Sequence, residues 1–147
     1  VAETAEGARG EGSGAEIVLT SSDSESWRSA YTAGEDREKR NKYVEIMRRI
    51  SVARQFAVAL VDNRPVAAGL GVLQDGWLTV LGMQTAPDCR RAGHAAAVLR
   101  GLAGWALEAG GKNTILQVET DNDPARGLYD RAGFKTVYGY HYRVAAE

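Results

Sequence analysis

The stretch that decides the fold is MQTAPDCRRAGHA at residues 83–95, because it passes from a strand pattern through a short loop into a helix. The first turn of a helix carries unpaired N–H groups and the positive end of the macrodipole. Gly93 and Ala95 leave room for an anion to approach those groups, and Arg90 and Arg91 add positive charge. The stretch lacks the Gly-Lys-Ser/Thr of a nucleotide-hydrolysing P-loop and the spaced glycines of a dinucleotide fold. It therefore predicts a local anion site of another kind.

Periodicity on both sides of this stretch predicts a mixed α/β (α+β) fold with about six strands. The expected strands are residues 16–20, 56–61, 66–73, 77–83, 115–120 and 135–144. Two helices are expected at residues 22–32 and 35–50. A third is expected from Ala95 to the Gly110-Gly111 stop, and a fourth is capped by Asp123 and ends before Gly133. The order is an antiparallel meander followed by β-α-β-α-β. Asp75-Gly76, between two meander strands, is typical of a two-residue hairpin turn.

Two patterns near the N-terminus predict helices. Ser22 and Glu25 have the Ser-x-x-Glu spacing of a capping box, which predicts a short helix to about Thr32. In residues 35–50, the apolar positions at helical spacing are Tyr43, Ile46, Met47 and Ile50. The charges between them alternate in sign, so we interpret them as a solvated face rather than a basic binding surface.

The composition limits the classes of function. The chain has 147 residues and a formal net charge of -1, which suits one domain and requires no polyanionic partner, so no nucleic acid is expected. It has no apolar run of about 18 residues, so no membrane association is expected. One cysteine and two histidines exclude an internal disulfide and favour no metal site, and they fit a reducing, cytoplasmic location. Residues 1–15 are expected to be a flexible tail or linker, and residues 16–147 the domain.

A second motif downstream gives the loop a family context. The matching positions are Asn122, Ala125, Leu128, Tyr129, Gly133 and Phe134, preceded upstream by Arg90, Gly93 and Ala95. In this order and spacing they resemble the two signatures of the GNAT superfamily of N-acetyltransferases. The resemblance covers roughly residues 56–144. It implies the GNAT fold, in which the strand before the loop and the strand before the second motif splay apart.

The resemblance implies acetyl-CoA as co-substrate and no metal. The pantetheine arm would enter the gap between the splayed strands, where backbone groups of Met83 and Thr85 would pair with it. A strand N–H placed there would also bond the thioester oxygen as it gains negative charge. The residues that the resemblance assigns to the cofactor are Met83, Gln84, Thr85, Arg90, Arg91, Ala92, Gly93, His94, Ala95, Ala96 and Asn122.

Catalysis in this family is direct attack of an amine on the acetyl carbonyl, which needs a base and an acid. Tyr129 matches the family acid, although its helical spacing also suits a core aromatic. Glu119 is the first candidate base, and a solvent-facing or structural role is its alternative. His141 is the second candidate, with a structural histidine as its alternative. A water chain without a single base is a further possibility.

Other residues have less specific predicted roles. Trp77, Trp105 and Phe56 are expected in the core. Trp27 and Tyr31 are candidate wall residues of the acceptor cleft, which the first helix borders in the family. His94 is interpreted as an exposed helix-start residue without acid or base function. Cys89 is interpreted as incidental, although neighbouring basic residues would lower its pKa.

The acceptor is expected to be a small-molecule or peptide amine. No motif in this sequence indicates which one. The loop and the linker-like start are similar to the C-terminal halves of two-domain bacterial members, so an upstream domain or a homodimer is a hypothesis. A non-catalytic CoA-binding regulatory domain is the alternative function, since the base is ambiguous. A protein-interaction module that uses the charged helix at residues 35–49 is a third alternative.

Overall fold

A computed structural model describes residues 8–9, 14–33, 37–90 and 92–116, all within one compact unit, Val1–Leu116. The strands are β1 (Ala8–Arg9), β2 (Glu16–Thr20), β3 (Arg54–Val61), β4 (Arg64–Gln74), β5 (Trp77–Thr85) and β6 (Asn113–Leu116). The helices are α1 (Glu25–Tyr31), α2 (Arg37–Met47) and α3 (His94–Glu108), with a short 3₁₀ turn, η1 (Pro87–Cys89). Among these residues, no helix is long and apolar enough to cross a membrane.

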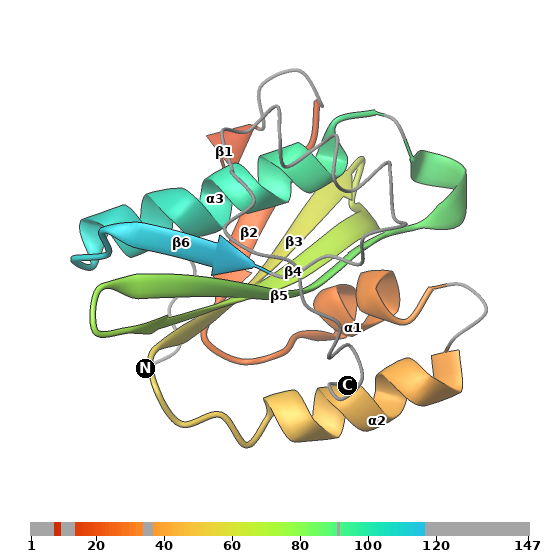
Figure 1. Cartoon of the computed structure of the whole chain (residues 1–147). Coiled ribbons are helices and arrows are strands. Elements are labelled where there is room, and N and C mark those ends of the chain that lie inside the picture. The colour runs from red at the N-terminus through yellow and green to blue at the C-terminus, as the bar shows by residue number, and fades with distance from the viewer. Residues whose placement is uncertain (1–7, 10–13, 34–36, 91, 117–147) are drawn as a thin grey trace. The chain divides into compact units, whose positions relative to one another are not determined.

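The strands form one sheet in the order β1-β2-β3-β4-β5-β6 (Figure 1). All neighbours are antiparallel except β5 and β6, which are parallel, with Trp77 opposite Asn113 and Val80 opposite Leu116. The mixed α/β sheet and the meander are therefore confirmed. β1 is a difference, because Ala8–Arg9 lies in the expected tail and pairs with β2. The expected helix after Asp123, the strand at 135–144 and the splaying itself lie outside the described residues.

Two tight turns set the register of the meander. Asp62 and Asn63 connect β3 to β4 with φ values of 51° and 68°. Asp75 and Gly76 connect β4 to β5 with φ values of 54° and 80°. Positive φ at both central residues is the type I′ geometry, which matches the twist of the two strands and favours Asn, Asp and Gly. The predicted Asp75-Gly76 turn is confirmed.

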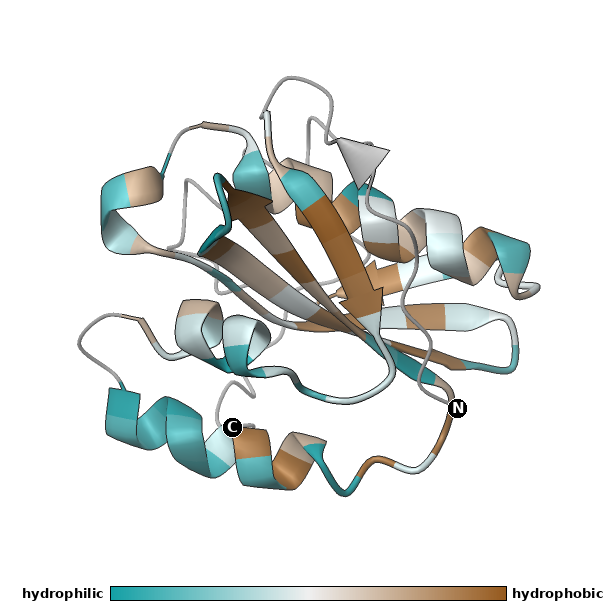
Figure 2. Cartoon of the chain, turned by 180° about the vertical axis from the view of Figure 1, so that it is seen from behind, coloured by the Kyte–Doolittle hydropathy of each residue, from teal (hydrophilic) through white to brown (hydrophobic). Residues whose placement is uncertain are grey.

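One face of the sheet is covered by α1 and α2. Its core contains Trp27 and Tyr31 of α1, stacked at 4.9 Å between ring centroids, with Phe56 edge-on to Trp27. The Trp27 indole N–H donates to the Gly69 carbonyl at 2.8 Å, which ties α1 to the centre of β4. Figure 2 shows the central strands as hydrophobic and most of α2 as hydrophilic. Trp27 and Tyr31 are fully buried, so they form core and not the open wall of an acceptor cleft.

The other face packs against α3, and small residues let the helix lie close to the sheet. A Cβ on Gly69 would lie 2.6 Å from the Met83 sulfur and 3.0 Å from Val98 of α3. A Cβ on Gly71 would lie 3.0 Å from Leu102. The buried positions of α3 include the predicted Val98, Leu99, Leu102 and Ala106, whereas Ala95 is half-buried. The apolar stripe of this helix is thus largely confirmed.

The N-terminus of α1 differs from the expected capping box. Ser24, not Ser22, is the N-cap, and its hydroxyl accepts from the Trp27 N–H at 3.1 Å. Asp23 instead accepts from Arg28 at 2.8 Å and from Arg48 at 3.0 Å. Burial alone would raise the pKa of Asp23, but the hydrogen bonds from Arg48 and Arg28 outweigh it and lower that pKa.

The buried face of α2 is rotated from the predicted one. Val44 and Met47 are buried, whereas Tyr43 is exposed and Ile46 is 57% exposed. Arg40 lies over the Tyr31 ring at 5.0 Å and completes the face that contacts α1. The predicted stripe was therefore wrong at Tyr43 and Ile46, because the surface of α1 selects the adjacent stripe.

The aromatic core predictions had mixed outcomes. Phe56 is 1% exposed, as expected. Trp105 is only half-buried, and Trp77 is 46% exposed. Trp77 begins β5 directly after the hairpin turn, on the face opposite the buried Leu78, so the described residues do not cover it. Its assignment to the core was wrong within the described part of the chain.

Candidate active site

The predicted anion loop begins where β5 leaves the sheet. The Ala86 N–H donates to the Val66 carbonyl at 2.8 Å, and the chain then enters η1. Arg90 follows in an extended conformation, and its side chain is exposed. Arg91 lies outside the described residues. The strand, the turn and the helix start thus form one continuous path, as the sequence predicts.

Gly93 is the N-cap of α3 and has a left-handed conformation, with φ of 82° and ψ of 9°. Its carbonyl accepts the Ala97 N–H at 3.1 Å, which is the first bond of the helix. The N–H groups of His94, Ala95 and Ala96 therefore have no carbonyl of α3 to bond. Gly93 supplies no capping side chain, and the two alanines are small. Within the described part of the chain, the first turn of this 15-residue helix therefore has unbonded N–H groups of the kind that bind anions.

The outer edge of β5 is the second part of the site. Gly82 has a positive φ of 62° at a bulge, where β5 gains one residue relative to β4. From Leu81 to Thr85 no described residue pairs with β5 on the β6 side, because the described β5–β6 pairs end at Val80 and Leu116. Backbone groups of this segment are the ones that the resemblance assigns to pantetheine.

The side chains of this segment have structural partners. The Met83 sulfur packs over Gly69 on the α3 face. The Gln84 amide donates to the Ala33 carbonyl at 3.1 Å, which joins β5 to the loop after α1. Any contact of Met83 or Gln84 with a cofactor would therefore use backbone atoms. Gly82 was missed in the sequence, although a glycine inside a strand pattern is a recognised signal of a bulge.

His94 differs from its interpretation as an exposed residue. Its side chain begins α3 yet is 7% exposed, and its Nδ1 atom is buried without a hydrogen-bond partner in the described structure. Burial lowers the pKa of His94, because the imidazolium is less well solvated there. Sequence reasoning missed this burial. His94 lines a pocket together with residues of a hairpin about 30 positions earlier in the chain.

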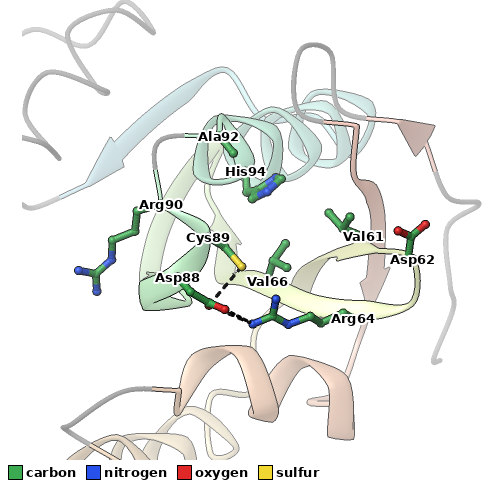
Figure 3. A pocket seen from close by; sticks show the side chains of 9 residues that line it. All are labelled: Val61, Asp62, Arg64, Val66, Asp88, Cys89, Arg90, Ala92 and His94. Atoms are coloured by element: carbon green, nitrogen blue, oxygen red, sulfur yellow. Dashed lines mark hydrogen bonds and ion pairs between the residues drawn. The ribbon is translucent and has the colours of Figure 1, made fainter.

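A pocket of about 570 Å³ lies between the β3–β4 hairpin, η1 and the start of α3 (Figure 3). It is lined by Val61, Asp62, Arg64, Val66, Asp88, Cys89, Arg90, Ala92 and His94. Arg64 and Asp88 form an exposed ion pair at 2.7 Å at its rim. The pocket is on the β4 side of β5, whereas the part of the β5 edge that no described residue pairs with is on the β6 side.

Cys89 has no feature of a nucleophile. Its thiol donates to Asp88 at 3.4 Å, and burial together with that carboxylate raises its pKa. Arg64 acts to lower this pKa but is outweighed, and the interpretation of Cys89 as incidental stays a prediction. Among the described residues, no group of three acidic, histidine or cysteine side chains is placed to hold a metal ion.

The predicted catalytic residues lie in a part of the chain that the structure leaves undescribed. Glu119, Asn122, Tyr129 and His141 all belong to residues 117–147. Their roles remain predictions from the resemblance. The described structure contains the β5 edge and the first turn of α3, which are the parts that the resemblance assigns to a cofactor.

Comparison with known protein families decides the identification. The model of the Acetyltransferase (GNAT) family matches residues 18–134. The chain belongs to this family. It is therefore an acetyltransferase enzyme with the GNAT fold. A search of curated proteins finds no match.

Solved structures share the GNAT fold with this chain. The aminoglycoside acetyltransferase AAC(6')-Iy, in complex with a CoA bisubstrate analogue, has a TM-score of 0.62 at 14% identity, covering 79% of this chain and 86% of its own. An aminoglycoside acetyltransferase from an uncultured soil metagenomic sample has a TM-score of 0.60 at 17% identity, with coverages of 78% and 82%. A transcriptional regulator from Bacillus halodurans has a TM-score of 0.65 at 13% identity, with coverages of 84% and 96%. At these identities the likeness concerns the fold alone.

Proposed function

We propose that this acetyltransferase transfers the acetyl group of acetyl-CoA to a primary amine by direct attack. The observation that carries the proposal is the first turn of α3, where Gly93 opens three N–H groups to an anion such as the CoA diphosphate. The CoA complex of a protein with the same fold supports the choice of co-substrate. Bound acetyl-CoA would supply the activated acetyl group.

The chain would hold this co-substrate largely through its backbone. The N–H groups of His94, Ala95 and Ala96 would bind the diphosphate, with charge from Arg90 and Arg91 nearby. The β5 edge between Leu81 and Thr85 would pair with the pantetheine amides. A backbone N–H of that edge would stabilise the negative charge that develops on the acetyl oxygen. Because backbone donors are fixed by the fold, they need no reorganisation when that charge appears.

The proton transfers would use side chains beyond Leu116. Tyr129 would protonate the departing thiolate, and Glu119 would accept the ammonium proton directly or through water. His141 is the second candidate for the base. Replacing Tyr129 by Phe would then reduce kcat with little change in CoA affinity, because only the protonation of the leaving group is lost.

The proposed acceptors are compounds that carry primary amines. Two structures with this fold come from enzymes that acetylate aminoglycosides, which carry several primary amines. Trp27 and Tyr31 fill the space under α1, so they do not offer an aromatic wall to an acceptor. Aminoglycosides, polyamines, amino-terminal peptides and lysine peptides form the appropriate acceptor panel.

The test uses acetyl-CoA carrying a ¹³C-labelled acetyl group, with the product followed by NMR and mass spectrometry. The proposal predicts that the label appears on an amine nitrogen together with one equivalent of free CoA. Release of free acetate alone, across the whole panel, would contradict amine transfer. Binding of CoA without any turnover would instead favour the non-catalytic alternative.

A further inference from the structure

His94 is the buried polar residue of the described structure that lacks a partner. Thr32, the other buried polar residue, donates its hydroxyl to the Arg28 carbonyl at 2.7 Å. The Nδ1 atom of His94 has no hydrogen-bond partner among the described residues. Buried polar atoms in native proteins are nearly always bonded, so an exception requires an explanation. This exception stands in the first turn of α3, at the proposed diphosphate site.

The charged and titratable groups around His94 come from three elements. The β3–β4 hairpin contributes Asp62 and Arg64, η1 contributes Asp88 and Cys89, and the following loop contributes Arg90. Arg64 and Asp88 bond to each other, and the Cys89 thiol also donates to Asp88. Figure 3 shows the Arg90 side chain directed away from the pocket. None of these groups bonds to the Nδ1 atom of the imidazole.

The local field of the free protein favours a neutral imidazole. Burial lowers the pKa of His94. Its position at the positive end of α3 acts in the same direction, because the helix macrodipole repels a cation there. Of the two carboxylates that line the pocket, Asp88 is paired with Arg64 and Asp62 forms no ion pair with a described residue. Burial still sets the direction of the His94 pKa, so Asp62 does not compensate for it. A bound anion on the first turn would reverse this balance.

We propose that His94 takes up a proton when the CoA diphosphate binds to the first turn of α3, and that the resulting imidazolium strengthens the binding. The inference rests on the proposed function, since it assumes that site for the diphosphate. The negative charge of the diphosphate cancels the helix field and attracts the imidazolium. The imidazole ring that contains this unpartnered nitrogen then carries a positive charge, and that charge stabilises the bound ligand.

The sign of the pH dependence follows from linkage. If the pKa of His94 is higher in the complex than in the free protein, the ligand prefers the protonated form. Affinity is then greatest below the free-state pKa and falls as the pH rises through the pKa of the complex. One titrating group limits this fall to about tenfold per pH unit. For each pH unit by which ligand binding raises the pKa of His94, the affinity for the ligand at low pH increases about tenfold.

The ligand for the test is 3′-dephospho-CoA. The 3′-phosphomonoester of CoA itself titrates at about pH 6 and would obscure the histidine. Calorimetry at pH 6.5, in buffers of different ionisation enthalpy, gives the number of protons taken up per ligand bound. We expect a substantial fraction of one proton for the wild type and none for His94→Gln.

A second readout needs no variant. NMR titration of the imidazole signals in the wild type gives the pKa of His94 with and without 3′-dephospho-CoA, and we expect it to rise on binding. Binding with an unchanged His94 pKa, or equal proton uptake in wild type and His94→Gln, overturns this inference and leaves the proposed function standing. No binding of CoA or 3′-dephospho-CoA at millimolar concentration overturns both.

Discussion

A charge placed at Gly93 tests the anion site with a matched pair of variants. Gly93 has a φ of 82°, and Asn and Asp are the non-glycine residues that tolerate the left-handed region best. Gly93→Asp and Gly93→Asn therefore carry similar backbone strain and similar volume. They differ by one negative charge at the N-cap of α3. Comparing the two variants with each other removes the cost of losing glycine.

The charge has opposite effects on folding and on binding. A carboxylate at a helix N-terminus stabilises the helix by about 0.3–1 kcal/mol through the macrodipole. The same carboxylate, about 5 Å from a bound phosphate, repels it by about 3 kcal/mol per charge pair at an effective dielectric constant of 20. Salt and solvent at this open loop reduce the repulsion to about 1–2 kcal/mol, which is roughly a 5- to 30-fold loss of affinity. Gly93→Asp should thus be at least as stable as Gly93→Asn but bind CoA more weakly.

Calorimetric titration with CoA measures the affinity, and thermal unfolding measures the stability. Gly104→Asp is the control, because Gly104 is an exposed residue of the same helix with open space around it. It adds the same charge near the middle of α3 and should leave CoA affinity within about twofold of the wild type, since exposed charges beyond about 10 Å are screened. Equal CoA affinity in Gly93→Asp and Gly93→Asn would refute the placement of the diphosphate on the first turn of α3.

Two further predictions concern stability. Gly69→Ala should lower the free energy of unfolding by about 1–3 kcal/mol, because its Cβ would approach the Met83 sulfur to 2.6 Å. Gly104→Ala should raise the free energy of unfolding by up to about 1 kcal/mol, because alanine has the higher helix propensity. Urea denaturation measures both, and the opposite ranking of the two variants would contradict the close packing of α3. Asp23 has a lowered pKa, so its ionised form adds stability that is present above the unfolded-state pKa of about 3.9 and is lost as the pH falls through the lower folded pKa. The stability difference between wild type and Asp23→Asn should therefore shrink between about pH 5 and pH 2, whereas Asp88→Asn, at an exposed pair, should show a smaller change.

The elements that the sequence predicted well are those fixed by local chemistry. The Asp75-Gly76 turn followed from the φ values that only a few residue types tolerate. The stripe Val98, Leu99, Leu102 and Ala106 was predictable because these positions recur at i, i+1, i+4 and i+8, which places them on one helical face. The path from β5 through the loop to Gly93 was predictable for the same reason, since each step has a short-range signal.

The predictions that were wrong concern positions where contacts with residues distant in the sequence decide between local alternatives. Two overlapping apolar stripes run along α2, and contact with Tyr31 selects the one containing Val44 instead of Ile46. Both Ser22 and Ser24 precede a helix pattern, but only Ser24 is the N-cap. Asp23, which lies between them, forms an ion pair with Arg48, a residue 25 positions away. The buried His94 likewise lines a pocket with residues of the β3–β4 hairpin, which are distant in the sequence. A single sequence contains no local signal for these contacts.

Amide NMR of the first turn of α3 is the most direct test of where the cofactor binds. With ¹⁵N-labelled protein, addition of CoA should shift the N–H protons of His94, Ala95 and Ala96 downfield, because charged phosphate oxygens replace water as their hydrogen-bond acceptors. The amides of Gly104 and Leu107, on the same helix, should shift much less. Saturable CoA binding that leaves the three first-turn amides unmoved would contradict this account of the site.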